Sequence, residues 1–150
     1  MSAVDANAVM DGLKGFQRDA VAHVIDRFYG PDRAAASGRF LVADETGLGK
    51  SIIARGVVAR SIEELERRRI PRIDIVYVCS NQDLARQNLK RLNVTGETQI
   101  EMTTRLTLLA KQSKKLDGGE AGNSKVNLVS FTPGTSFSGG GWRQGNADER

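Results

Sequence analysis

Apolar residues recur at helical spacing in the first part of the chain. Between residues 16 and 28 they lie three or four positions apart, which predicts a helix with one buried face. The pair Gly30-Pro31 then ends that helix, because proline lacks the amide hydrogen that a helix interior needs. The same periodicity predicts further helices over 7–10, from Lys50 to near Arg69, over 83–92 and over 103–116.

Three short apolar runs separate these helices and predict buried strands over 39–43, 73–79 and 126–131. The second run is almost continuously apolar, as is typical of a strand that helices cover on both faces in a parallel sheet. Because strands and helices alternate, we predict an α/β fold, a parallel sheet with helices on both faces and right-handed crossovers. The leucines expected to face the core from helix 83–92 are Leu84, Leu89 and Leu92.

Composition places the chain among ordinary globular proteins. Its 150 residues match about one domain, with 39% hydrophobic and 27% charged residues. No apolar run approaches the roughly 20 residues of a membrane-spanning helix, and the N-terminus lacks the basic cluster of a secretory signal. Cys79 is the only cysteine, which excludes an intrachain disulfide and favours a reducing, cytoplasmic setting.

The segment DETGLGKS, residues 44–51, carries the chemistry. It lies between a predicted strand and a predicted helix, the context of a phosphate-binding loop. Gly47 and Gly49 allow positive φ angles and close approach to an anion, and loop amides point at the phosphates. Lys50 is expected to reach the β- and γ-phosphates of a bound nucleotide, and the Ser51 hydroxyl to ligate Mg²⁺. The predicted nucleotide-binding residues of the loop are Thr46, Gly47, Leu48, Gly49, Lys50 and Ser51.

One position departs from the strict phosphate-loop pattern, because Asp44 stands where that pattern has glycine. The plainer alternative is a glycine-rich turn that contains Lys-Ser by coincidence. The whole segment nevertheless resembles motif I of superfamily 2 helicases and translocases of the DEAD/DEAH-box-like kind, in the form D-E-x-G-L-G-K-[ST] of Swi/Snf-type motors. That family commonly lacks the first glycine. Upstream, FQRDAV at 16–21 resembles the Q motif, which implies that Gln17 recognises adenine.

Two further segments resemble the nucleic-acid motifs of this superfamily. VYVCSNQ at 76–82, with LARQN after it, is similar to motif Ia, and FTPGTSF at 131–137 is similar to motif Ib of DEAD-box proteins. The resemblance implies contacts to a phosphodiester backbone, of DNA in preference to RNA. The alternative for the second segment is a Pro-Gly turn that ends a strand. The residues implied are Ser80, Asn81, Thr132, Gly134 and Thr135.

Two clusters of basic residues can be explained either as nucleic-acid contacts or as ordinary solvated helix surfaces. The net charge of +4 permits a polyanionic partner without requiring one. The arginines at 67–69 are explained by a solvated helix end near the negative pole of the helix dipole. Between residues 81 and 115 basic residues outnumber acidic ones by seven to three, a ratio that is also common on helix surfaces.

The resemblance covers residues 16–137, the front part of a RecA-like P-loop domain. It leaves 1–15 as an N-terminal lead and 138–150 as a glycine-rich tail. The Asp-Glu pair of motif II and the second motor domain are missing from the matched part. We therefore expect the chain to be the N-terminal portion of a longer motor, with the remaining domain beyond residue 150. In the full-length motor Lys50 would serve ATP hydrolysis, and we expect no hydrolysis by this portion alone.

Two other functions stay open at this point. The first is a non-catalytic module that binds ATP and responds to it, complete as it stands. The second is a P-loop enzyme unrelated to nucleic acid, such as a small-molecule kinase. Sequence patterns of this kind identify a site and not a pathway.

Overall fold

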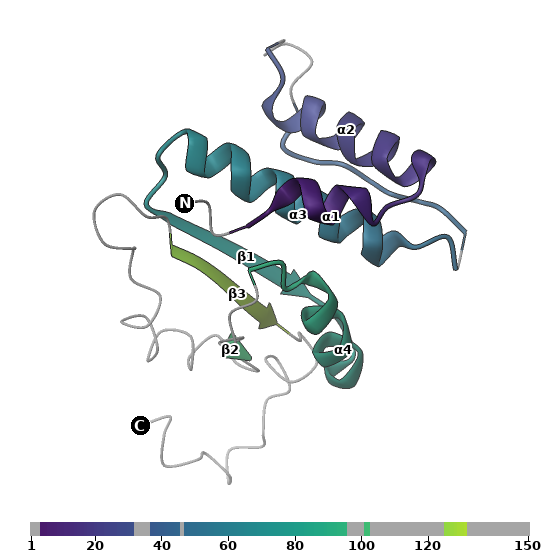
Figure 1. Cartoon of the computed structure of the whole chain (residues 1–150). Helices are drawn as coiled ribbons and strands as arrows, with labels where there is room; N and C mark the ends of the chain where they lie inside the picture. Colours follow the sequence, from purple (N-terminus) through teal and green to yellow (C-terminus); the bar gives the residue numbers. More distant parts are fainter. Residues whose placement is uncertain (1–3, 32–36, 46, 96–100, 103–124, 132–150) are drawn as a thin grey trace, which may run out of the picture.

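The structure is a computed structural model that describes residues 4–31, 37–45, 47–95, 101–102 and 125–131. It confirms a mixed α/β fold in which a small parallel sheet packs against helices (Figure 1). The elements in chain order are α1 (Ala6–Asp11), α2 (Gly15–Tyr29), α3 (Lys50–Arg67), β1 (Arg72–Val78), α4 (Gln82–Leu92), β2 (Glu101–Met102) and β3 (Lys125–Phe131).

The sheet has the strand order β1-β3-β2, and β3 pairs in parallel with both neighbours. Ile73 lies opposite Val126, and the pairing continues to Val78 opposite Phe131. The predicted strands over 73–79 and 126–131 are thus confirmed, as is their parallel direction. The two-residue strand β2 was not predicted, because residues 93–102 have no apolar run to indicate a strand.

Helix α3 lies between the sheet and the pair formed by α1 and α2 (Figure 1). Toward β1, its Ala59 and Ile62 pack in one buried cluster with Ile73. Nearer its N-terminus, Ile53 joins a second cluster with residues of α1 and α2, including Val21. Together with Gly56, these residues recur at every third position of α3, which brings them to one broad buried stripe. The segment 1–15, expected as a polar lead, contributes to both clusters through Val4, Ala6, Met10 and Leu13.

Gly56 allows α2 to approach α3 closely. A Cβ atom at this position would lie 2.8 Å from Val21 Cγ2 and 3.1 Å from Leu13 Cδ2. Glycine in a helix interior is destabilising by about 0.5–1 kcal/mol relative to alanine. The close helix contact gives this glycine a packing role that offsets its low helix propensity.

Helix α4 covers the sheet on the same face as α3. The Tyr77 hydroxyl accepts a hydrogen bond of 2.8 Å from Asn88 Nδ2, and Tyr77 shares its face of β1 with Ile73. Leu89 and Leu92 are buried as predicted, but the prediction for Leu84 is wrong, since it is 50% exposed. The buried side chain is Ala85, because a position four residues before Leu89 shares its helix face and a position five residues before does not.

The opposite face of β1 is open in the described part of the chain, where Val76 and Val78 are 59% and 57% exposed. No described helix covers this face. The helix predicted over 103–116 lies outside the described residues, so helices on both faces of the sheet stay a prediction.

The predicted strand over 39–43 is wrong. Within the described part of the chain this segment pairs with no other strand, and Leu41 is 83% exposed. Its contacts go to the helices, since the Phe40 ring meets the His23 ring of α2 edge-on at 5.4 Å and Val42 packs against the cluster around Ile53. An apolar run becomes a strand only where a neighbouring strand satisfies its backbone, and here the side chains bind α2 and α3 instead.

We expect Gly56→Leu to destabilise the protein, because the larger side chain cannot fit between α2 and α3. Overpacking of this kind typically costs about 1–3 kcal/mol. Urea unfolding followed by circular dichroism measures the change. Ala54→Leu is the matched control, since Ala54 lies on the exposed face of the same helix and should change stability by less than about 0.5 kcal/mol. Equal losses in the two variants would contradict the close contact at Gly56.

Candidate phosphate-binding site

The loop of residues 44–49 turns the chain directly into the N-terminus of α3. Gly47 and Gly49 have φ angles of 95° and 87°, a backbone conformation that favours glycine. Gly49 is the residue that caps α3, and its carbonyl oxygen accepts hydrogen bonds from Ile52 N at 2.8 Å and Ile53 N at 3.0 Å. Both glycines therefore occupy positions where the turn itself requires them.

Lys50 folds back across this loop. Its Nζ donates hydrogen bonds to the carbonyl oxygens of Asp44 at 2.8 Å and Glu45 at 2.9 Å. The ammonium group remains exposed, while Ser51 beside it is half-buried. A positive charge is thus held at the mouth of the turn, where the first amides of α3 add the partial positive charge of a helix N-terminus.

Gln17 connects this loop to α2. The side chain is only 4% exposed, and its two ends are both engaged. Gln17 Oε1 accepts from Lys14 N at 3.0 Å, as in a capping box at the start of α2, and Nε2 donates to the Leu48 carbonyl at 3.2 Å. The structure therefore places the predicted adenine-recognising residue against the loop, and the recognition of adenine itself stays a prediction.

Gly49 is constrained by packing as well as by its positive φ angle. A Cβ atom at this position would lie 2.6 Å from Gln17 Nε2, which is too short for the amide to remain where it is. At Gly47, by contrast, an added Cβ would meet nothing within 4 Å. The sequence motif indicated both glycines, but it gave no signal for the side chain that closes over the second one.

Ser80 and Asn81 follow the carboxyl end of β1, and both are exposed. The Asn81 side chain caps α4, because its Oδ1 accepts from Asp83 N at 2.9 Å and from Leu84 N at 3.0 Å. The preference of asparagine for helix N-caps could have indicated this role from the sequence. The other predicted site residues, Thr46, Thr132, Gly134 and Thr135, lie outside the described residues.

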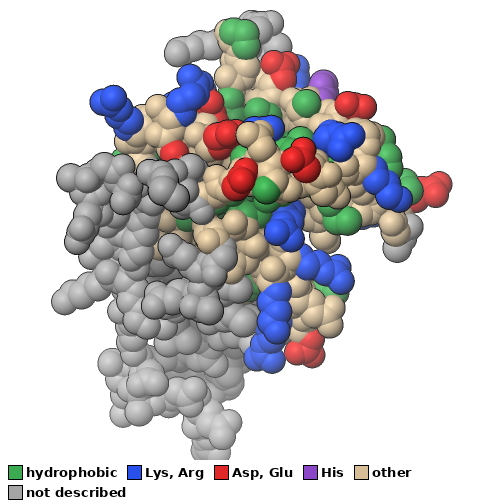
Figure 2. All heavy atoms as spheres, viewed as in Figure 1, with side chains coloured by type: hydrophobic (Ala, Val, Ile, Leu, Met, Phe, Trp, Pro, Cys, Tyr) green, Lys and Arg blue, Asp and Glu red, His purple; other side chains and the backbone are tan. Residues whose placement is uncertain are grey.

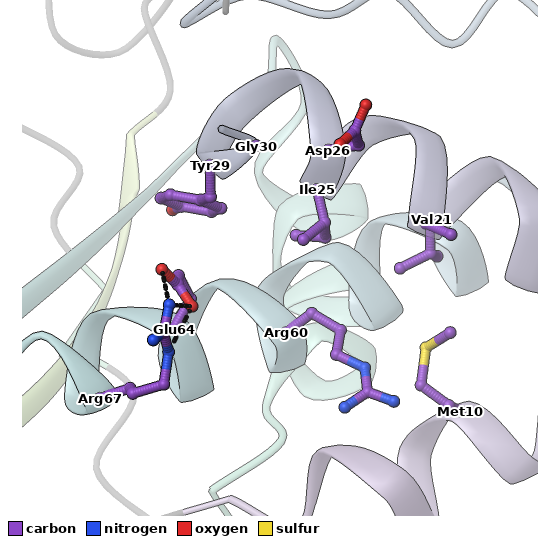
Figure 3. A pocket seen from close by; sticks show the side chains of 10 residues that line it. Met10, Val21, Ile25, Asp26, Tyr29, Gly30, Arg60, Glu64 and Arg67 are labelled. Carbon is purple, nitrogen blue, oxygen red and sulfur yellow. Dashed lines mark hydrogen bonds and ion pairs between the residues drawn. The ribbon is translucent and has the colours of Figure 1, made fainter. Parts of the chain in front are cut away.

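A cavity of about 420 Å³ opens elsewhere, between α1, α2 and α3 (Figure 3). Apolar side chains such as Ile25 form one part of its wall, and Glu64 and Arg67 form another. Hydrogen bonds from Arg67 and Arg68 lower the pKa of Glu64, so this carboxylate is held in an ion-paired form. None of the described loop residues, 44–45 and 47–49, lines this cavity, which is separate from the candidate phosphate-binding site.

Two other features, a metal site and a membrane-spanning helix, are absent from the described ranges. These ranges contain no group of three or more His, Cys, Asp or Glu side chains placed to hold a metal ion. None of their helices is long and apolar enough to span a bilayer. No protein-family model, curated protein or solved structure matches the chain. What the chain does must therefore be inferred from its own residues.

We expect Gly49→Ala to destabilise the protein more than Gly47→Ala. Both changes place an alanine at a positive φ, at a cost of about 1–2 kcal/mol, but only the first meets the Gln17 amide. In a Gln17→Ala background the additional cost at Gly49 should disappear. Urea unfolding of the four variants of this double-mutant cycle should give a coupling energy of about 0.5–3 kcal/mol. The same cycle built on Gly47 is the control and should be additive; coupling of equal size there would refute the contact.

We expect the ion pairs of Glu64 to stabilise the protein above the pKa of the unfolded carboxyl, near 4.5. Because the folded pKa is lowered, this contribution is lost as the pH falls through it. Since the pair lies at the surface, the loss should be below about 1 kcal/mol. Stability measured between pH 6 and pH 2.5 should fall less steeply in Glu64→Gln than in the unsubstituted protein. Arg67→Gln/Arg68→Gln should flatten the same part of the curve, and a steep curve in both variants would contradict the assignment.

Proposed function

We propose that this chain is the nucleotide-binding part of an ATP-dependent nucleic-acid helicase or translocase of superfamily 2. The observation that carries the proposal is the geometry of residues 44–51. Two glycines with positive φ turn the chain into a helix N-terminus, and a lysine ammonium lies across the same turn. This arrangement is a ready anion-binding site, because oriented amides and the Lys50 ammonium converge on it.

The residues present fit a bound nucleoside triphosphate. The Lys50 ammonium would exchange the carbonyl oxygens of Asp44 and Glu45 for phosphate oxygens, since its hydrogen bonds to those carbonyls involve no carboxylate. The Ser51 hydroxyl, in the first turn of α3, would be a ligand of Mg²⁺. When bound, ATP and Mg²⁺ would supply the transferable phosphoryl group and the neutralisation of its charge.

Part of the fold supports a RecA-like P-loop domain as the finer architecture, although the segment before the loop forms no strand within the described residues. The loop precedes α3, α3 covers a parallel sheet, and Ser80 lies at the carboxyl end of β1. Ligands of open α/β sheets bind at the carboxyl ends of the strands. By this proposal, Ser80 and the segment 132–135 contact the backbone of DNA in preference to RNA, and closure of two such domains around ATP drives movement along it.

The test begins with binding of Mg²⁺-ATP to this chain, measured by isothermal titration calorimetry. We expect Lys50→Ala to weaken the affinity by about tenfold to a hundredfold, because a hydrogen bond to a charged group contributes about 1.5–3 kcal/mol. Arg55→Ala is the control, since it removes one positive charge from the exposed face of the same helix. It should leave the affinity unchanged.

Hydrolysis of ATP, measured with and without single-stranded and duplex DNA, then separates the functions. Turnover that DNA stimulates would support a motor, and its loss in Lys50→Ala would assign the loop to it. Binding of ATP without hydrolysis in any context would favour a responsive binding module. Turnover that DNA leaves unchanged would favour a P-loop enzyme with another substrate. Equal ATP affinity in Lys50→Ala and in the unsubstituted protein would refute the phosphate-binding site itself.

A further inference from the structure

The exposed side of α4 carries a concentration of positive charge. Arg86, Lys90 and Arg91 are all exposed, while Ala85, Leu89 and Leu92 on the other side are buried. In the space-filling view, blue Lys and Arg side chains gather at the position that α4 occupies in Figure 1 (Figure 2). We call Arg86, Lys90 and Arg91 the α4 basic face.

The charges of the α4 basic face are hardly neutralised by the protein. Its ion pair within the described residues joins Arg86 to Asp83 at 3.6 Å, and both side chains are more than half exposed. No ion pair is formed by Lys90 or Arg91 with any other described residue. Such exposed charges are stabilised by water and by whatever polyanion comes near.

The arginines at the end of α3 provide a comparison within the same molecule. Arg67 and Arg68 both reach Glu64 at 2.7 Å, and the Arg68 guanidinium also lies over the Tyr29 ring at 5.2 Å. Both cations therefore have interaction partners within the protein, on α3 and on α2. Arg67 and Arg68 are thus paired within the protein, whereas the cations of the α4 basic face remain available to a binding partner.

The α4 basic face belongs to the helix that follows Ser80, a predicted nucleic-acid contact. Helix α4 packs against α3, the helix that the phosphate loop opens, and it begins directly after Ser80 and its cap Asn81. Arg86 and Lys90 are one helical turn apart, a rise of about 6 Å. Over that length one strand of duplex DNA presents about two phosphates, so both cations can meet one backbone.

We propose that the α4 basic face binds the phosphodiester backbone of nucleic acid through sequence-independent contacts. This inference rests on the proposed function and deepens it by adding a second contact surface to the end of β1. A rival explanation is that Lys90 and Arg91 only stabilise the last turn of α4 through the helix dipole. That explanation predicts a loss of stability in charge-neutralised variants and no loss of binding.

The experiment measures fluorescence anisotropy of a labelled 20-nucleotide oligothymidylate, and of its duplex form, across a range of salt concentrations. We expect Lys90→Gln/Arg91→Gln to weaken binding at low salt by about tenfold or more. The slope of log affinity against log salt for the single strand should fall by about 1.4, because each phosphate contact contributes about 0.7. Arg67→Gln/Arg68→Gln is the matched control, since it removes the same charge from paired arginines. It should change the slope little.

The remaining outcomes overturn the inference in distinguishable ways. Equal losses in both double variants would show an effect of net charge alone. A lower melting temperature of Lys90→Gln/Arg91→Gln with unchanged oligonucleotide binding would show that these residues only stabilise α4 through the helix dipole. Displacement of the oligonucleotide by polyglutamate at equal charge would assign an acidic protein as the partner. If ATP binding still depends on Lys50, each of these results refutes nucleic-acid binding by the α4 basic face and leaves the proposed function standing. If ATP binding does not depend on Lys50, the proposed function is refuted separately.

Discussion

The burial of α3 between two layers is the constraint on which the rest of the structure depends. One end of its buried stripe packs with β1 through Ile62, and the other end packs with α1 and α2 through Ile53. Gly56 in between removes the one side chain that would hold α2 at a distance. Because a helix is stiff, fixing it at both ends also fixes the direction of its first turn. The phosphate loop is attached to that turn, so its position is set by packing and not by the loop itself.

The contact between Gln17 and the loop adds a second constraint on the same site. The amide of Gln17 holds the start of α2 and the Leu48 carbonyl together, although 31 residues separate them. Gly49 is the position where this buried amide and the turn come closest. A site residue that recognises a ligand usually leaves a hydrogen-bonding group free for it. In this structure each end of the Gln17 amide makes one hydrogen bond, so a second N–H and a second lone pair remain with which adenine would be recognised.

The sequence allowed most of the described elements to be predicted, and two of the failures share one physical cause. The helices α2, α3 and α4 follow apolar periodicity, and β1 and β3 follow apolar runs, all of which are local signals. The run at 39–43 carries the same local signal, yet it packs Phe40 and Val42 against helices, because pairing depends on a neighbour that the sequence does not name. The engagement of Gln17 likewise depends on a distant partner, whereas the exposure of Leu84 follows from helix spacing, because Ala85 lies four residues before Leu89 and Leu84 lies five before it. Glycines with positive φ, in contrast, were predictable, because the motif specifies the turn.

The distribution of ion pairs, and not composition alone, decides whether a basic cluster in this chain is available to a binding partner. Arg67 and Arg68 look in sequence like the more concentrated cluster, but Glu64 lies one turn before them and takes both. Lys90 and Arg91 have no acidic residue at the preceding turn, where Arg86 and Gln87 stand instead. Since side chains three and four residues apart are neighbours on a helix, the difference follows from spacing and could be read without a structure. The packing of α4 adds what spacing cannot: the side that carries these cations faces away from α3 and the sheet, toward solvent.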